Sequence, residues 1–226
     1  MSVEDVTQSK PVLVFVPGLA ADGSVYAPFL RALRKDFDVR SADHPLALPD
    51  GDLTWDFFFD PIDRALQGTP GYLVGHSMGG AIALKYAADH PRRVRKVVAV
   101  APILFPFKRH RHRIRESLRN AVLAIRGWNL PHAIRSLRAI RARASGGRGR
   151  KLYDFVHTID LSDDLPRLRN ATILFPKREE IVPQEHADRV STRFPNVSVK
   201  QVPGSHHNVA LSPQRLVNTV RKELDG

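Results

Sequence analysis

The sequence has no cysteine among its 226 residues, which excludes a disulfide framework and a thiolate metal site. A cysteine-free chain suits a reducing compartment, so we expect a cytoplasmic protein. The first ten residues, MSVEDVTQSK, lack the basic and then apolar order of a secretory signal. No apolar run approaches the roughly 18 residues that a membrane-spanning helix needs.

Acidic residues are almost absent from one part of the chain. Residues 102–151 contain 14 lysines and arginines but a single acid, Glu116, whereas the rest holds 21 basic and 22 acidic residues. Three interpretations remain open: a solvated face, attraction of an anionic substrate or acyl carrier, and contact with an anionic membrane surface. Few aromatic residues interrupt the arginines, which disfavours nucleic acid. We favour an anionic partner, because the excess is larger than solubility requires.

Apolar runs and helical spacings alternate along the rest of the chain. Strands are predicted at 12–16, 38–43, 71–76, 94–102, 171–176 and 197–203, and helices at 24–36, 56–67, 78–89, 184–193 and 213–223. This order predicts an α/β fold with a doubly wound, mostly parallel sheet of about six strands. Residues 1–102 and 161–226 form the predicted core. Residues 103–160 are an insertion of two or three amphipathic helices, and the glycine-rich stretch 144–151 is expected to be a flexible loop.

A serine between two glycines stands where the third predicted strand meets a helix, in YLVGHSMGGA, residues 72–81. Gly75 and Gly79 leave room for a tight turn, so that Ser77 can expose its hydroxyl as a nucleophile. The N–H of Met78, at the start of the helix, can then donate to a developing oxyanion. His76, inside this turn, is expected to shape it rather than to react.

On these motifs the chain resembles the α/β-hydrolase fold superfamily. The resemblance implies a second oxyanion donor after the first strand, in VPGLAADGSVY, at the N–H of Leu19, with a proline in place of the family's histidine. It implies an acid in FPKREEIVP, where Glu179 takes the family's aspartate position and the neighbouring Glu180 stays an alternative. The base is implied in PGSHHNVALSP, where His206 fits the spacing to a later proline and His207 is the fallback.

This set predicts a serine hydrolase that cleaves a carboxylic ester or thioester with the triad Ser77, Glu179 and His206. An acyltransferase or lyase of the same fold, or a binding module without turnover, stays an alternative. The resemblance implies that the insertion forms a lid, because it follows the strand after the nucleophile helix. An acyl pocket is expected near its aromatic residues Phe105, Phe107 and Trp128. His44 is placed at the pocket mouth. No cofactor is required, and the remaining histidines stand at spacings that predict no metal site.

Overall fold

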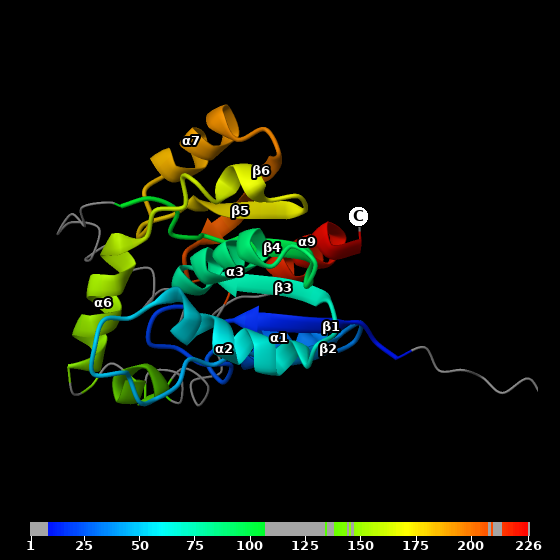
Figure 1. Ribbon diagram of the computed structural model, residues 1–226. Helices are drawn as coiled ribbons and strands as arrows, with labels where there is room; N and C mark the ends of the chain where they lie inside the picture. Colours follow the sequence, from blue (N-terminus) through cyan, green and yellow to red (C-terminus); the bar gives the residue numbers. More distant parts are fainter. Residues whose placement is uncertain are drawn as a thin grey trace, which may run out of the picture.

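The computed structural model describes residues 9–106, 134, 138–143, 145, 147–207, 209 and 214–225. Their centre is a six-stranded sheet in which all neighbouring strands are parallel, in the order β2-β1-β3-β4-β5-β6 (Figure 1). The strands are β1 (Val12–Val16), β2 (Asp38–Ser41), β3 (Gly71–His76), β4 (Val94–Val100), β5 (Ala171–Arg178) and β6 (Val197–Ser205). The predicted doubly wound α/β sheet is thereby confirmed, with strand ends differing by a few residues.

Helices cover both faces of the sheet, which explains why β1, VLVFV, is apolar without interruption. They are α1 (Ala27–Leu33), α2 (Trp55–Leu66), α3 (Met78–Asp89), α7 (Glu185–Arg193) and α9 (Gln214–Asp225), with a short 3₁₀ turn, η1 (Leu165–Arg167). In β1, Val14 and Val16 join the core under α2 and α3, whereas Leu13 and Phe15 join the core under α1 and α9. The run VLVFV is therefore buried by alternation between two cores.

A further helix, α6 (Arg148–Thr158), includes residues 148–151, so the predicted flexible loop over residues 144–151 is wrong at these four positions. Gly147 begins it in the left-handed region, with φ of 76°. Arg148 donates to the carbonyls of Pro45 and Leu46, and Lys151 donates to those of residues 49–51. Contacts with a loop about 100 residues earlier thus fix the start of this helix, and no local pattern indicates them.

The inner face of α6 packs on the core at the edge where the strands end (Figure 1). The Phe155 ring lies 4.6 Å from that of Phe58 and 5.1 Å from that of Trp55, measured between ring centroids. The prediction of a helical lid over residues 103–160 stays a prediction, because residues 107–133 lie outside the described ranges. Among the described residues, no helix combines the length and apolarity needed to cross a membrane.

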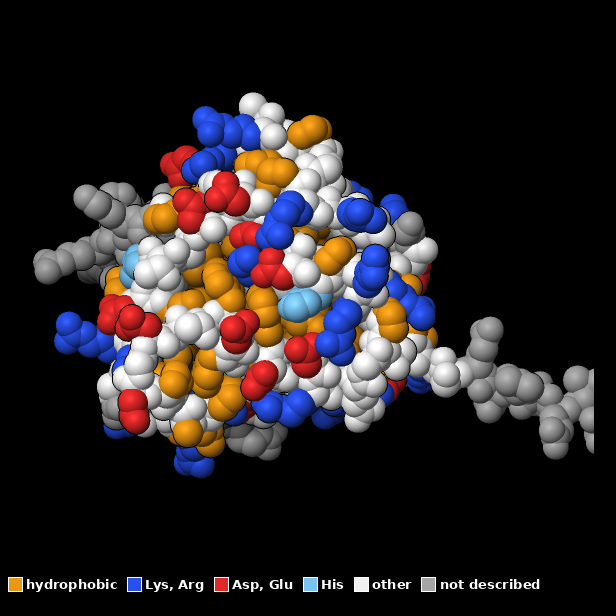
Figure 2. Space-filling view, viewed as in Figure 1, with side chains coloured by type: hydrophobic (Ala, Val, Ile, Leu, Met, Phe, Trp, Pro, Cys, Tyr) orange, Lys and Arg blue, Asp and Glu red, His pale blue; other side chains and the backbone are white. Residues whose placement is uncertain are grey.

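Charges of both signs are mixed over the face that α2 and α3 cover (Figure 2). Arg93 pairs with Asp63 at 2.6 Å, and Lys85 and Arg167 each pair with Asp89 at 2.7 Å. This mixture agrees with the near-neutral balance of the chain outside residues 102–151.

Candidate active site

Ser77 lies in a strained turn between β3 and α3. Its φ of 55° and ψ of −121° are sparsely populated for a residue with a side chain, and its N–H donates to the Val100 carbonyl at 2.9 Å. A Cβ atom at Gly75 would lie 2.3 Å from the Gly79 carbonyl oxygen, and one at Gly79 would lie 2.2 Å from that of Val16. The two glycines are thus required by close backbone approach, as the sequence predicted.

Glu179 and His206 are in contact in the structure, although 27 residues separate them. His206 Nδ1 lies 2.8 Å from Glu179 Oε1, and both side chains are almost fully buried. The same oxygen accepts the N–H groups of Ile181 and Val182 at 2.9 Å each, which fixes the carboxylate behind the ring. A carboxylate only accepts, so His206 carries a proton on Nδ1, and Nε2 is the acceptor in the neutral form of the ring.

Glu180 and His207, the two alternatives from the sequence, occupy different positions. Glu180 accepts the backbone N–H of His206 at 3.3 Å, and its other oxygen lies 3.8 Å from His207 Nε2. Burial, together with the nearby His206, lowers the pKa of His207 to about 4. The contact with the His206 ring therefore belongs to Glu179, while Glu180 holds the backbone of the same residue.

The two predicted oxyanion donors follow neighbouring strands, β1 and β3. Met78 is the first residue of α3, so its N–H has no acceptor one turn earlier in the helix. Leu19 lies in the loop after β1, next to Ala20, which has a positive φ of 54°. Because parallel strands end at one edge of a sheet, both loops lie at the edge that carries Ser77.

His44 is buried against the loop after β1. Its Nε2 lies 3.1 Å from the Pro17 carbonyl oxygen, and its ring packs edge-on against Phe58. Burial, reinforced by the charges of Arg143 and Arg148, lowers the pKa of His44 to about 4. A neutral His44 therefore donates to Pro17 and supports the loop from behind.

Sequence reasoning missed a chain of hydrogen bonds behind Ser77. Tyr26 Oη lies 3.2 Å from the Gly18 nitrogen and 2.9 Å from His76 Nδ1, and His76 Nε2 lies 3.0 Å from the His206 carbonyl oxygen. Tyr26 falls within the predicted helix 24–36, where helical spacing places it with the apolar residues Phe29, Leu30 and Leu33. Nothing in the local pattern marks it as a partner of a histidine 50 positions later.

Of the predicted acyl-pocket residues, only Phe105 belongs to the described part of the chain. Phe107 and Trp128 lie outside it. The Phe105 ring is buried against α7. Its centroid lies 3.9 Å from the Arg189 guanidinium carbon and 5.2 Å from the centroid of the His186 ring. These contacts on α7 account for its burial without a ligand.

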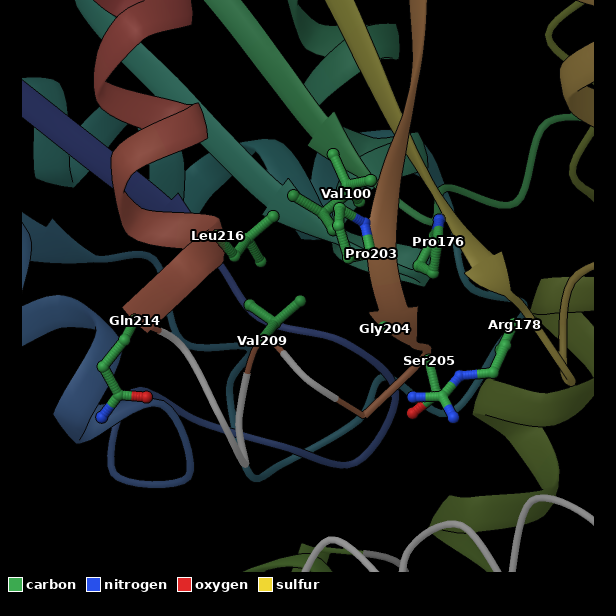
Figure 3. A pocket seen from close by; sticks show the side chains of 10 residues that line it. Val100, Pro176, Arg178, Pro203, Gly204, Ser205, Val209, Gln214 and Leu216 are labelled. Carbon is green, nitrogen blue, oxygen red and sulfur yellow. The ribbon is translucent and has the colours of Figure 1, made fainter.

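A cavity of about 320 Å³ lies between β6 and the start of α9 (Figure 3). Val100, Val202 and Leu216 form its apolar part, and these residues belong to the core under α1 and α9. The cavity therefore lies under α9, and it is lined by Ser205 and Val209, on either side of His206 in the sequence. In the described ranges, no group of three or more His, Asp or Glu side chains is arranged to hold a metal ion.

A parallel sheet of this order, with a strained serine between β3 and α3 and an acid and a histidine after the last two strands, defines the α/β-hydrolase fold. Residues 11–115 match the family model described as alpha/beta hydrolase fold. The chain therefore has the α/β-hydrolase fold.

Individual relatives match at different lengths. The chain is 35% identical over 102 residues to the "Putative carbamate hydrolase RutD" of Serratia proteamaculans; this segment is 42% of the chain and spans only 38% of the relative. An N-formylmaleamic acid deformylase from Pseudomonas putida matches with a TM-score of 0.73 and 20% identity, covering 94% of this chain and 92% of that one. An enol-lactonase from Burkholderia xenovorans matches with a TM-score of 0.75 and 16% identity, covering 98% and 94%. At these identities the two structures show the shared fold.

Proposed function

We propose that the protein is a serine hydrolase that cleaves a carboxylic ester or thioester through an acyl-enzyme on Ser77. The contact between Glu179 and the His206 ring is the observation that carries this proposal. It holds the ring with Nε2 as the acceptor, which is the form that a general base requires.

In the proposed reaction, Ser77 Oγ attacks the acyl carbonyl carbon while His206 Nε2 takes the hydroxyl proton. The carbonyl oxygen gains the negative charge and accepts the N–H groups of Met78 and Leu19. Collapse of this intermediate breaks the bond to the leaving group, which takes the proton from His206. Water then repeats the sequence on the acyl-enzyme, releasing the carboxylic acid and restoring Ser77. Throughout, Glu179 stabilises the charged imidazole.

The printed names of the similar proteins include a carbamate hydrolase, a deformylase and an enol-lactonase. All three names imply attack on a carbonyl carbon, so a substrate panel for this chain should include carbamates and lactones beside esters and thioesters. Acyl transfer or elimination on the same residues remains the alternative, and product analysis of that panel separates them.

The charge of the described basic residues supports a preference for anionic substrates. Arg138, Arg141, Arg150 and Lys151 are exposed near or on α6, at the edge of the sheet that carries Ser77. Arg150 has one acidic neighbour, Asp154, at 3.9 Å. Positive charge beside a site raises the encounter rate with anions.

The experiment that tests the proposal is labelling with a fluorophosphonate, read by intact mass and peptide mapping, with Ser77→Ala as the control. A single adduct on Ser77 that Ser77→Ala abolishes is the expected result. Folded protein that gives no adduct, or an adduct elsewhere, would overturn the proposal and favour a binding module without turnover.

A further inference from the structure

The hydrogen bonds behind Ser77 have one consistent direction. A carbonyl oxygen only accepts, so His76 Nε2 carries a proton and donates it to the His206 carbonyl. Burial and the nearby His206 and His207 hold the pKa of His76 well below its usual range, so the ring is neutral and Nδ1 is an acceptor. Tyr26 then donates its hydroxyl proton to Nδ1 and accepts the Gly18 N–H.

The two ends of this series of hydrogen bonds belong to two different loops of the candidate active site. Gly18 immediately precedes Leu19, whose N–H is the proposed oxyanion donor, and His206 is the proposed base. Tyr26, at the start of α1, and His76, at the end of β3, stand between the loops. We propose that Tyr26 and His76 are positioning residues. They hold the loop after β1, which carries Gly18 and Leu19, at a fixed position relative to the segment after β6, which carries His206.

The packing around these groups supports a fixed geometry rather than an incidental contact. Tyr26, His76 and His206 are between 3% and 5% exposed. A Cβ atom at Gly18 would lie 3.1 Å from Tyr26 Oη and 3.4 Å from His76 Nδ1, so the loop fits closely over the pair. A buried hydrogen-bond chain of this kind transmits a displacement at one end to the other, because the side chains have no solvent to replace their partners.

This inference rests on the proposed function, since it assigns roles around the same nucleophile. Tyr26→Phe removes one hydroxyl and keeps the ring. The matched control is Tyr86→Phe, which removes the hydroxyl of another buried tyrosine, bonded to Asp63 at 2.5 Å and on the opposite face of the sheet. At His76, Gln keeps an N–H donor at the length of Nε2, whereas Leu removes both interactions.

The readout is saturable inactivation of the full chain by a fluorophosphonate, which separates the maximal rate from the half-saturating concentration. Tyr26→Phe and His76→Leu are expected to lower the maximal rate at least about tenfold with the half-saturating concentration within about twofold, because misplaced groups affect the transition state. We expect His76→Gln to lose less than His76→Leu, and Tyr86→Phe to keep the wild-type rate. A wild-type maximal rate in Tyr26→Phe, or an equal loss in Tyr86→Phe, would overturn the proposal while leaving the serine hydrolase intact.

A spectroscopic measurement decides the same question without activity. Nitrogen-15 NMR of labelled histidine should show His76 as the neutral Nε2–H form in the wild type and a changed Nδ1 signal in Tyr26→Phe. A His76 protonated on Nδ1 would refute the chain of donors. If Ser77 is never labelled, the proposed function fails, and the NMR result then shows separately whether Tyr26 and His76 make these bonds.

Discussion

His44 should make the stability of this protein depend on pH in a window that can be calculated. The side chain is 3% exposed and its pKa falls from the ordinary value of about 6.5 to about 4, mainly through burial. Between these two values the unfolded chain binds a proton at this position and the folded chain does not. The free energy of unfolding is therefore highest above pH 6.5 and falls as the pH decreases towards 4.

The magnitude follows from the width of that window. At about 1.4 kcal/mol for each pKa unit, a shift of about 2.5 units corresponds to about 3 kcal/mol between pH 6.5 and pH 4. That is a large part of the total stability of a typical domain. His207, with its pKa also lowered to about 4, contributes in the same direction.

The assay is urea unfolding of the wild type and His44→Gln at a series of pH values from 7.5 to 4.5. Gln retains an N–H donor for the Pro17 carbonyl but does not titrate, and His207 is unchanged, so the difference between the two curves isolates His44. We expect the wild type to lose about 2 kcal/mol more than the variant across this range. Parallel curves would refute the claim that burial keeps His44 neutral.

Three further results are expected. Glu179→Gln should lower kcat about 10³-fold or more, because the His206 tautomer is no longer held, whereas Glu180→Gln should lower kcat less than about tenfold. Equal losses, or the reverse order, would contradict the assignment of the acid. Gly79→Ala should destabilise the protein by more than about 4 kcal/mol in urea unfolding, because its Cβ would lie 2.2 Å from the Val16 carbonyl oxygen. The control Gly51→Ala, whose Cβ would meet nothing within 4 Å, should unfold like the wild type. For an anionic ester, kcat/KM should fall as salt is added, whereas kcat/KM for a neutral ester with the same leaving group should stay unchanged. The same salt dependence for both esters would exclude steering by the basic residues.

Much of the candidate site could be predicted because its signals are local. A buried strand, two glycines and a serine within five residues specify the turn at Ser77, and the close approaches at Gly75 and Gly79 show why no other residue fits. The alternation of apolar runs with helical spacings specified the parallel sheet. Since parallel strands end at one edge, the loops after β1, β3, β5 and β6 meet there.

Tertiary structure decided what sequence spacing leaves open. Glu179 and Glu180 are adjacent and chemically alike, and the turn in which Ile181 and Val182 donate to Glu179 determines which carboxylate reaches the His206 ring. The bond of Tyr26 to His76 and the start of α6 at Arg148 depend on groups 50 to about 100 residues away. Sequence determines which groups are present and the conformations of short segments, but hydrogen bonds between distant segments form only when the packed sheet brings them together.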